Sequence, residues 1–223
     1  MVIQRSIPWV IYAATYAQLL PLLAAARHRF RLTPQRRWTL VWCIALLAGD
    51  AIQYFTGSGT TNNLWVQYVV VPLQNAIMLW TLSLWQQDPV SRLAFRVAIP
   101  LYLAALLALI PAVQVAATFN QITWPFQAFL LLAGSLYTLV RRSIGEPERV
   151  TSRDWFWITL GTSLYFAFRM ALPPFVQLML PAHRELATQA YLVSSGADII
   201  ASALIARGML CPLPQPARSG GFS

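Results

Sequence analysis

Seven long apolar runs, separated by short polar links, dominate the hydrophobic pattern of the chain. Each run is about as long as an α-helix must be to cross a bilayer, roughly 17 to 25 residues. Helices satisfy their own backbone hydrogen bonds, as a lipid environment requires. The pattern therefore predicts an all-α, polytopic membrane protein, a bundle of seven transmembrane helices over residues 7–26, 38–55, 64–85, 93–113, 122–140, 155–180 and 186–206.

Composition agrees with lipid as the solvent of this chain. Of its 223 residues, 57% are hydrophobic and only 10% are charged, whereas soluble domains carry about 25% charged residues. The links are too short to hold a further domain, so residues 1–210 form one predicted transmembrane domain. Residues 211–223 are rich in proline and glycine and predict a disordered tail.

The arginines set the predicted orientation, because cytoplasmic loops are enriched in basic residues. Thirteen arginines fall in one set of alternating segments and only Arg5 and Arg184 in the other. This asymmetry places the N-terminus outside and the C-terminus in the cytoplasm. A cleaved signal peptide is the alternative for the first run. The five arginines of residues 27–37 resist translocation, and they favour a retained helix.

Charge and residue types exclude several kinds of chemistry. The net charge of +9 is spread over short links between apolar runs, unlike the single basic face of a nucleic-acid-binding domain, so no nucleic acid is expected. The chain has no lysine, which excludes a retinal or pyridoxal Schiff base. His28 and His183 fall in links, and Cys43 and Cys211 are isolated. We expect no cofactor and no metal.

Polar residues inside the apolar runs gather on particular helical faces, and they define a candidate ligand or ion pocket. Asp50, Arg169 and Asp198 are the ionisable acids and bases well inside the runs. At 1.5 Å rise per residue they lie ~18, ~21 and ~14 Å from the cytoplasmic ends of their helices. The full set of candidates is Asp50, Gln53, Gln74, Asn75, Arg169, Tyr191, Ser195 and Asp198.

Two interpretations of these charges stay open. A charge in the bilayer centre costs at least ~2.5–3.5 kcal/mol, so Arg169 is expected to pair with Asp50 or with Asp198. The pair could serve packing alone, since polar contacts between membrane helices contribute ~0.6 kcal/mol on average. Alternatively, two carboxylates beside one guanidinium leave a surplus acid that binds a proton or a cation.

The chain also resembles known membrane families to different degrees. The stretch 198–202 matches the last helix of microbial rhodopsins except that Ser202 replaces the retinal lysine, which argues against that family. Small sugar transporters share the topology, but their Pro-Gln dipeptide is absent. A closer likeness is to a group of small bacterial seven-helix proteins without a known activity, carried by residues 62–65, 72–74, 82–85, 154–158 and 204–211. That resemblance implies a bacterial inner-membrane location.

Three classes of function follow as hypotheses. The leading one is a non-enzymatic sensory or scaffolding module that works through partner proteins, with basic loops 27–37 and 141–154 facing the cytoplasm and anionic lipid. The second is a small transporter or proton-coupled permease that uses Asp50, Arg169 and Asp198. An intramembrane enzyme is the weakest, because Ser194 and Ser195 have no evident activating base.

Overall fold

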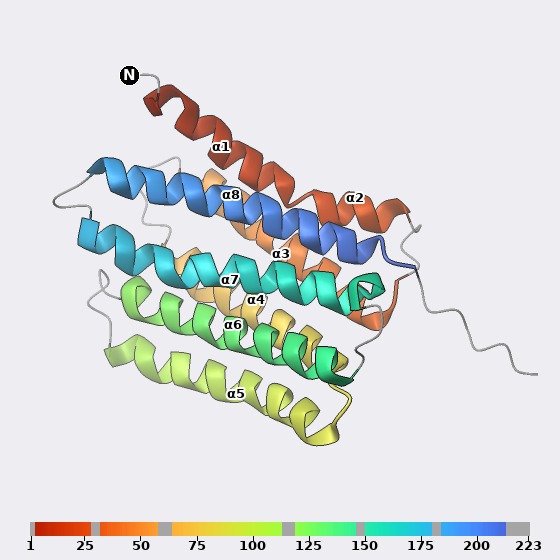
Figure 1. Cartoon of the computed structure of the whole chain (residues 1–223). Helices are drawn as coiled ribbons and strands as arrows, with labels where there is room; N and C mark the ends of the chain where they lie inside the picture. The colour runs from red at the N-terminus through yellow and green to blue at the C-terminus, as the bar shows by residue number, and fades with distance from the viewer. Residues whose placement is uncertain are drawn as a thin grey trace, which may run out of the picture.

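The computed structural model of the chain describes residues 3–27, 32–57, 64–112, 119–145, 150–179 and 184–212. Within these ranges the chain is helical apart from short turns, so the all-α prediction is confirmed (Figure 1). A single 3₁₀ turn, Val150–Ser152, precedes the seventh helix. The α-helices are α1 Ile3–Ala17, α2 Leu20–Arg27, α3 Pro34–Gly57, α4 Leu64–Trp85, α5 Pro89–Ala112, α6 Phe119–Gly145, α7 Asp154–Met179 and α8 Arg184–Met209.

The first predicted helix, over residues 7–26, is two helices in the structure. Pro21 lacks the backbone N–H that would bond to Ala17, and its ring crowds that carbonyl, so α1 ends at Ala17. Two tight backbone hydrogen bonds turn the chain, from Gln18 N to Thr15 O (3.2 Å) and from Leu19 N to Tyr16 O (3.0 Å). Pro21 then lies in the first turn of α2, where a missing N–H costs little.

Capping residues explain why α3 and α5 begin four residues before the predicted starts. In each case a capping side chain precedes a proline, at Thr33-Pro34 and at Asp88-Pro89. Thr33 Oγ1 accepts from the Arg36 amide (3.4 Å), and Asp88 Oδ2 accepts from the Ser91 amide (2.8 Å). These bonds satisfy backbone donors of the first turn, so the helices start at their polar caps and not at their apolar runs.

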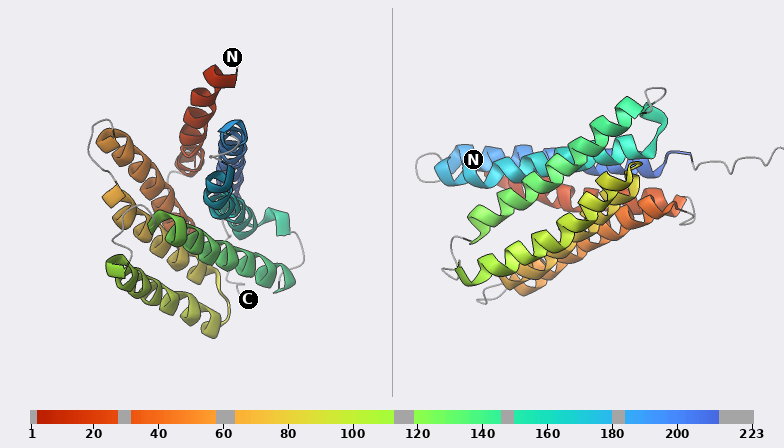
Figure 2. Two further views of the ribbon diagram at one scale, coloured as in Figure 1. Left: turned by 90° about the vertical axis from the view of Figure 1, so that its left-hand side faces the viewer. Right: turned by 90° about the horizontal axis from the view of Figure 1, so that it is seen from below.

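The helices run up and down along one common direction, as an elongated bundle (Figures 1 and 2). The closest packing joins α7 to α8 and to α6, and α4 to α3 and α5, while α1 and α2 lie along α8. Gly161 of α7 permits this close approach, because a Cβ there would lie 2.8 Å from the Ala201 carbonyl oxygen of α8. The outer half of α1 diverges from α3 (Figure 2).

Aromatic side chains fill the core of the bundle between α3 and α7. The Trp42 ring of α3 lies 5.7 Å from Tyr165 and 6.0 Å from Phe166 of α7, measured between ring centroids. Met78 and Leu131 contribute fully buried side chains from α4 and α6. Large aromatic rings therefore join α3 to α7, although the backbones of these two helices make few close contacts.

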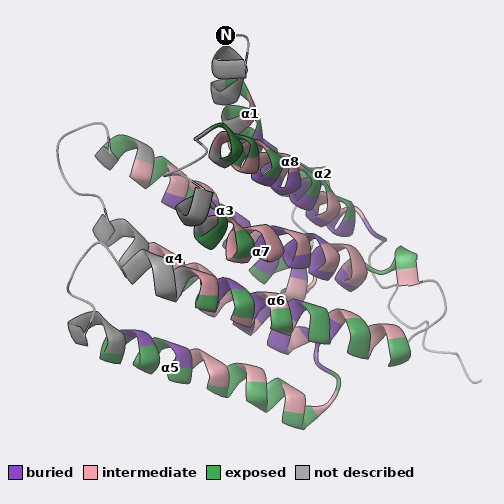
Figure 3. Cartoon of the chain, turned by 60° about the vertical axis from the view of Figure 1, so that its left-hand side comes forward, coloured by how far each residue is buried: buried purple, intermediate pink, exposed green. Residues whose placement is uncertain are grey.

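The outer face of α5 is strongly apolar and exposed. Leu93, Leu101 and Leu107 are 62%, 65% and 69% exposed, and exposed positions run along this helix (Figure 3). In the described part of the chain, two helical stretches are long and apolar enough to cross a membrane, Pro89–Ala108 and Thr188–Met209. Only 11% of the first is buried inside the bundle, so α5 is not a core helix.

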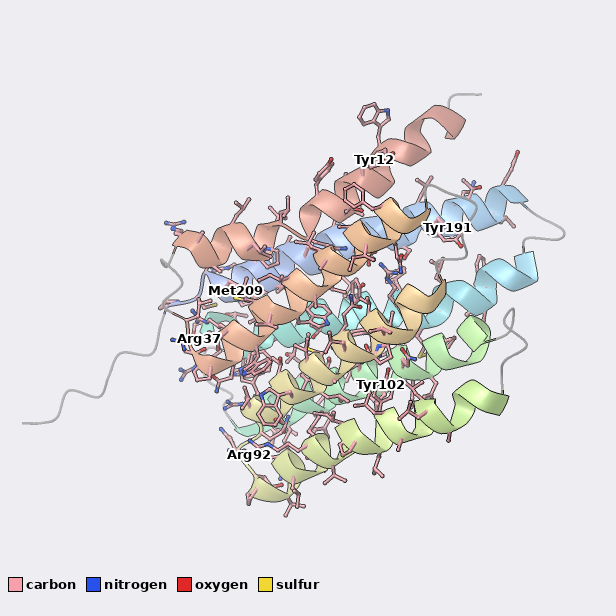
Figure 4. The ribbon with its side chains drawn as sticks, turned by 180° about the vertical axis from the view of Figure 1, so that it is seen from behind. Tyr12, Arg37, Arg92, Tyr102, Tyr191 and Met209 are labelled. Carbon is pink, nitrogen blue, oxygen red and sulfur yellow. The ribbon has the colours of Figure 1, made fainter. Side chains whose placement is uncertain are left out.

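The arginine-rich helix ends gather at one end of the bundle. The C-terminal ends of α2, α4, α6 and α8 meet the N-terminal ends of α3, α5 and α7 there. Arg37, Arg92 and Met209 mark this end in Figure 4, and Tyr12 and Tyr191 lie toward the other. The alternation of basic links along the sequence thus becomes a charge asymmetry between the two ends in space.

Candidate functional site

Four chain segments bring a group of polar side chains together in the interior. We call it the central polar cluster, and it consists of Gln18, Asp50, Tyr165, Arg169 and Asp198. Gln18 lies at the break between α1 and α2, Asp50 in α3, Tyr165 and Arg169 in α7, and Asp198 in α8. Three of these residues are the charged residues that the sequence analysis expected to meet.

Arg169 pairs with Asp198. Its Nη2 lies 3.4 Å from Asp198 Oδ2, and its guanidinium stacks over the Tyr165 ring at 5.0 Å from the centroid. Of the two carboxylates that the sequence offered as partners, Asp198 is therefore the one that bonds Arg169. Asp198 is buried, and its second oxygen, Oδ1, has no hydrogen-bond partner among the described residues.

Asp50 has a different partner. Its Oδ2 accepts a hydrogen bond from Gln18 Nε2 at 3.0 Å, and the Arg169 guanidinium is within electrostatic reach. Gln18 was not among the predicted pocket residues. The feature that could have identified Gln18 is its position three residues before Pro21. That proline breaks the helix, and at the break the Gln18 amide can turn inward.

The charge of the cluster is unbalanced. Two carboxylates face one guanidinium, so the ionised cluster carries one net negative charge. A small cavity of ≈ 10 Å³ borders it, lined among others by Gln18, Tyr165 and Ser202, which is room for about one water. The cluster is therefore chemically suited to hold one proton or one small cation.

No protein-family model, curated protein or solved structure matches the chain. The geometry of the site must therefore carry the functional argument. In the described ranges, no group of three or more His, Cys, Asp or Glu residues is arranged to hold a metal ion.

The remaining predicted pocket residues lie elsewhere. Gln74 donates to the Ala45 carbonyl of α3 (2.9 Å), which ties α4 to α3. Asn75 donates to Tyr102 Oη (2.9 Å) and to Gln127 Oε1 (3.0 Å), and so forms a separate buried junction of α4, α5 and α6. These amide contacts fit interhelical packing.

Three candidates of the predicted pocket are less buried. Tyr191 is 47% exposed on α8, and Gln53 and Ser195 are partly buried. A single helical face was the reason for grouping Tyr191 with Asp198. However, the described residues from 185 to 193 are exposed or half-buried, so the N-terminal part of the polar stripe on α8 lies outside the interior that encloses Asp198.

A second buried charge, Arg36, holds the arginine-rich end together. We call Arg36 and its partners the Arg36 clamp. Arg36 is 1% exposed, and its Nε lies 2.8 Å from Asp154 Oδ2 at the start of α7. Its Nη atoms donate to the carbonyls of Met209 (3.4 Å), Cys211 (2.9 Å) and Pro212 (3.3 Å) at the end of α8.

The Arg36 clamp also binds the first residues of the predicted C-terminal tail. Cys211 is buried, so the ordered chain continues through residues 211 and 212 of the predicted tail; residues 213–223 lie outside the described residues. Burial raises the pKa of the Cys211 thiol, which keeps it protonated and unreactive at neutral pH. In the sequence, Arg36 is one of five arginines in the basic loop 27–37, and nothing there distinguishes it from the others.

Proposed function

We propose that the chain is a multi-pass protein of a bacterial inner membrane, with seven spans, its N-terminus outside and its C-terminus in the cytoplasm. Two observations support this. The apolar face of α5 is exposed along its length, and soluble monomers rarely expose so continuous an apolar surface. The arginine-rich ends also share one end of the bundle, as the positive-inside rule requires of spanning helices.

Within that membrane, we propose that the central polar cluster is the proton or cation site of a small transporter. The observation that carries this proposal is the pairing pattern: Arg169 bonds Asp198, while Asp50 bonds the neutral Gln18. One carboxylate therefore lacks a full counter-charge, and an isolated charge in a bilayer is costly. A bound proton or cation removes that cost.

The surrounding architecture supports the same function. The cluster lies beside the α1–α2 break, and transporters place ion sites at broken helices near the middle of the membrane. A cycle follows from the residues. When the proton moves from Asp50 to Asp198, the attraction of Asp198 for Arg169 weakens, and the guanidinium then favours the ionised Asp50, which is within electrostatic reach. The two ionic states pull α7 toward different neighbours, α8 or α3.

Proton flux into liposomes tests this function. With the purified protein reconstituted, a pH gradient and a potassium–valinomycin potential, the wild type is expected to acidify the lumen faster than protein-free liposomes do. Asp50→Asn and Asp198→Asn should each return the rate to that of protein-free liposomes. Glu185→Gln, which removes an exposed acid at the start of α8, should leave the rate of acidification unchanged. Equal flux in the wild type and both cluster variants would exclude a proton carrier.

A sensory or scaffolding module, the leading hypothesis from the sequence, becomes the second candidate, and exposed arginines favour it. Arg27, Arg37 and Arg207 are exposed at the arginine-rich end, where an acidic surface of a partner could bind. If proton flux is absent while a protein is recovered reproducibly from native membranes with the wild type but not with Arg37→Ala, this hypothesis takes first place.

A further inference from the structure

A second cavity lies far from the central polar cluster, at the arginine-rich end. It has a volume of ≈ 230 Å³, many times the ~10–15 Å³ that a single water needs. The turn from α4 to α5 forms one wall and the last two turns of α6 form the other. We call it the α4–α6 cavity; its polar lining includes Gln87, Asp88, Ser91, Arg141 and Arg142, and Gly145 also lines it.

The charges of the α4–α6 cavity favour an anion. Arg141 and Arg142 contribute two positive charges, and Asp88 contributes one negative charge. The Ser91 amide and hydroxyl hold the pKa of Asp88 below its usual range, so it stays ionised at neutral pH. The ionised lining thus carries a net charge of +1.

Asp88 is engaged mainly by its own turn, although the Arg141 charge also helps to lower its pKa. Its Oδ2 accepts from the Ser91 amide and hydroxyl, both at 2.8 Å, and its Oδ1 accepts from the Val90 amide (3.4 Å). The Arg142 guanidinium lies beside the Trp155 ring, 5.8 Å from its centroid, a cation–π contact that favours this position of the side chain. The cavity is therefore built and positively charged before any ligand enters.

The walls of the cavity also change from polar to apolar. Ile144 lines it and is 72% exposed, and Val90 and Val140 are exposed beside it on α5 and α6. A polar cavity that opens beside an apolar helix surface suits an amphiphile whose charged group enters and whose hydrocarbon stays outside. Basic pockets between helices on the cytoplasmic side of membrane proteins bind anionic headgroups for this reason.

We propose that the α4–α6 cavity binds a phosphate group of low charge, supplied by the phosphodiester of an anionic phospholipid or by free inorganic phosphate. Arg141 and Arg142 face the phosphate oxygens, as guanidinium groups do in phosphate sites. The lipid source depends on the proposed membrane location, whereas the free-phosphate source does not. Neither source depends on proton transport by the central polar cluster.

Binding to the purified protein in a neutral detergent tests the proposal with two probes, inorganic phosphate by calorimetry and phosphatidylglycerol by native mass spectrometry. Arg141→Gln is expected to weaken binding about tenfold, the typical worth of one charged hydrogen bond. Gly145→Phe should weaken it similarly by filling the cavity, without a change of charge. Arg37→Gln is the matched control, since it removes an exposed arginine at the same end, and it should bind as the wild type does.

The pattern across the probes identifies the source. Loss of phosphatidylglycerol binding alone in Arg141→Gln and Gly145→Phe supports a lipid headgroup site, and loss of phosphate binding supports a site for the free ion. The proposal is overturned if Arg37→Gln weakens binding as much as Arg141→Gln, because the effect is then one of general charge. It is also overturned if Gly145→Phe binds both probes like the wild type, or if the wild type binds neither probe.

Discussion

Replacing Arg36 by alanine is expected to lower the free energy of unfolding by ~3–5 kcal/mol, the usual cost of breaking a buried ion pair. The change leaves the Asp154 carboxylate without its partner at 2.8 Å. It also removes the donors to the carbonyls at the end of α8. Thermal unfolding in detergent measures the loss, expected as a fall in midpoint of roughly 6–20 °C at ~2–4 °C per kcal/mol.

Arg37→Ala is the matched control for the Arg36 clamp. Arg37 is the next residue of α3 and carries the same charge, but its side chain is exposed. An exposed charge contributes ~0–1 kcal/mol, so its loss should shift the midpoint by only a few degrees. Arg36→Lys keeps the charge without the planar fork, and an intermediate loss is expected. Equal midpoints for Arg36→Ala and Arg37→Ala would refute the clamp.

The second large effect is expected at Arg169. Arg169→Leu leaves two carboxylates in the interior without a guanidinium, and Asp198 loses its partner at 3.4 Å. Because the Arg169 side chain is 27% exposed, we expect a loss of ~2–3 kcal/mol, below the range for a fully buried pair. Thermal unfolding of the same detergent-purified variants measures this loss.

Neutralising the acids should reverse most of the Arg169→Leu effect. The triple variant Arg169→Leu/Asp50→Asn/Asp198→Asn removes every charge of the cluster, and the amide introduced at position 50 can still accept a hydrogen bond from Gln18. Its stability is expected to return to within ~1 kcal/mol of the wild type, since a buried pair often contributes little against a neutral replacement. A triple variant as unstable as Arg169→Leu would show that the guanidinium acts by packing on Tyr165, and not by charge.

Strong local rules explain what the sequence predicted well. Long apolar runs and the arginine clusters between them impose helices and their alternation, and the structure has helices in every predicted run. A pairing of Arg169 with Asp50 or Asp198 was also expected, because charges in an apolar run need partners, and the structure shows that the partner is Asp198. Helix starts were predicted less well, since Thr33 and Asp88 extend α3 and α5 through caps that an apolar run does not include.

Contacts that depend on three-dimensional packing were not visible in the sequence. Arg36 looks like each of the other loop arginines until α7 and α8 bring Asp154 and the Met209 carbonyl around it. Gln18 reaches Asp50 only because Pro21 breaks the first helix. Asn75 was placed in the same predicted pocket as Gln74 because it is the adjacent residue, yet adjacent residues on a helix point about 100° apart, and the two bond to different neighbours.

The most direct measurement of the central claim is the labelling of single introduced cysteines with a membrane-impermeant maleimide in spheroplasts. Three exposed positions are compared, Glu185 at the start of α8, Thr151 before α7 and Ile200 in the middle of α8, which is 56% exposed. The proposed membrane topology predicts that Glu185→Cys reacts in sealed spheroplasts and Thr151→Cys only after permeabilisation, while Ile200→Cys reacts in neither because lipid covers it. Rapid labelling of Ile200→Cys, as for any water-exposed residue, or labelling of Thr151→Cys in sealed spheroplasts would contradict it.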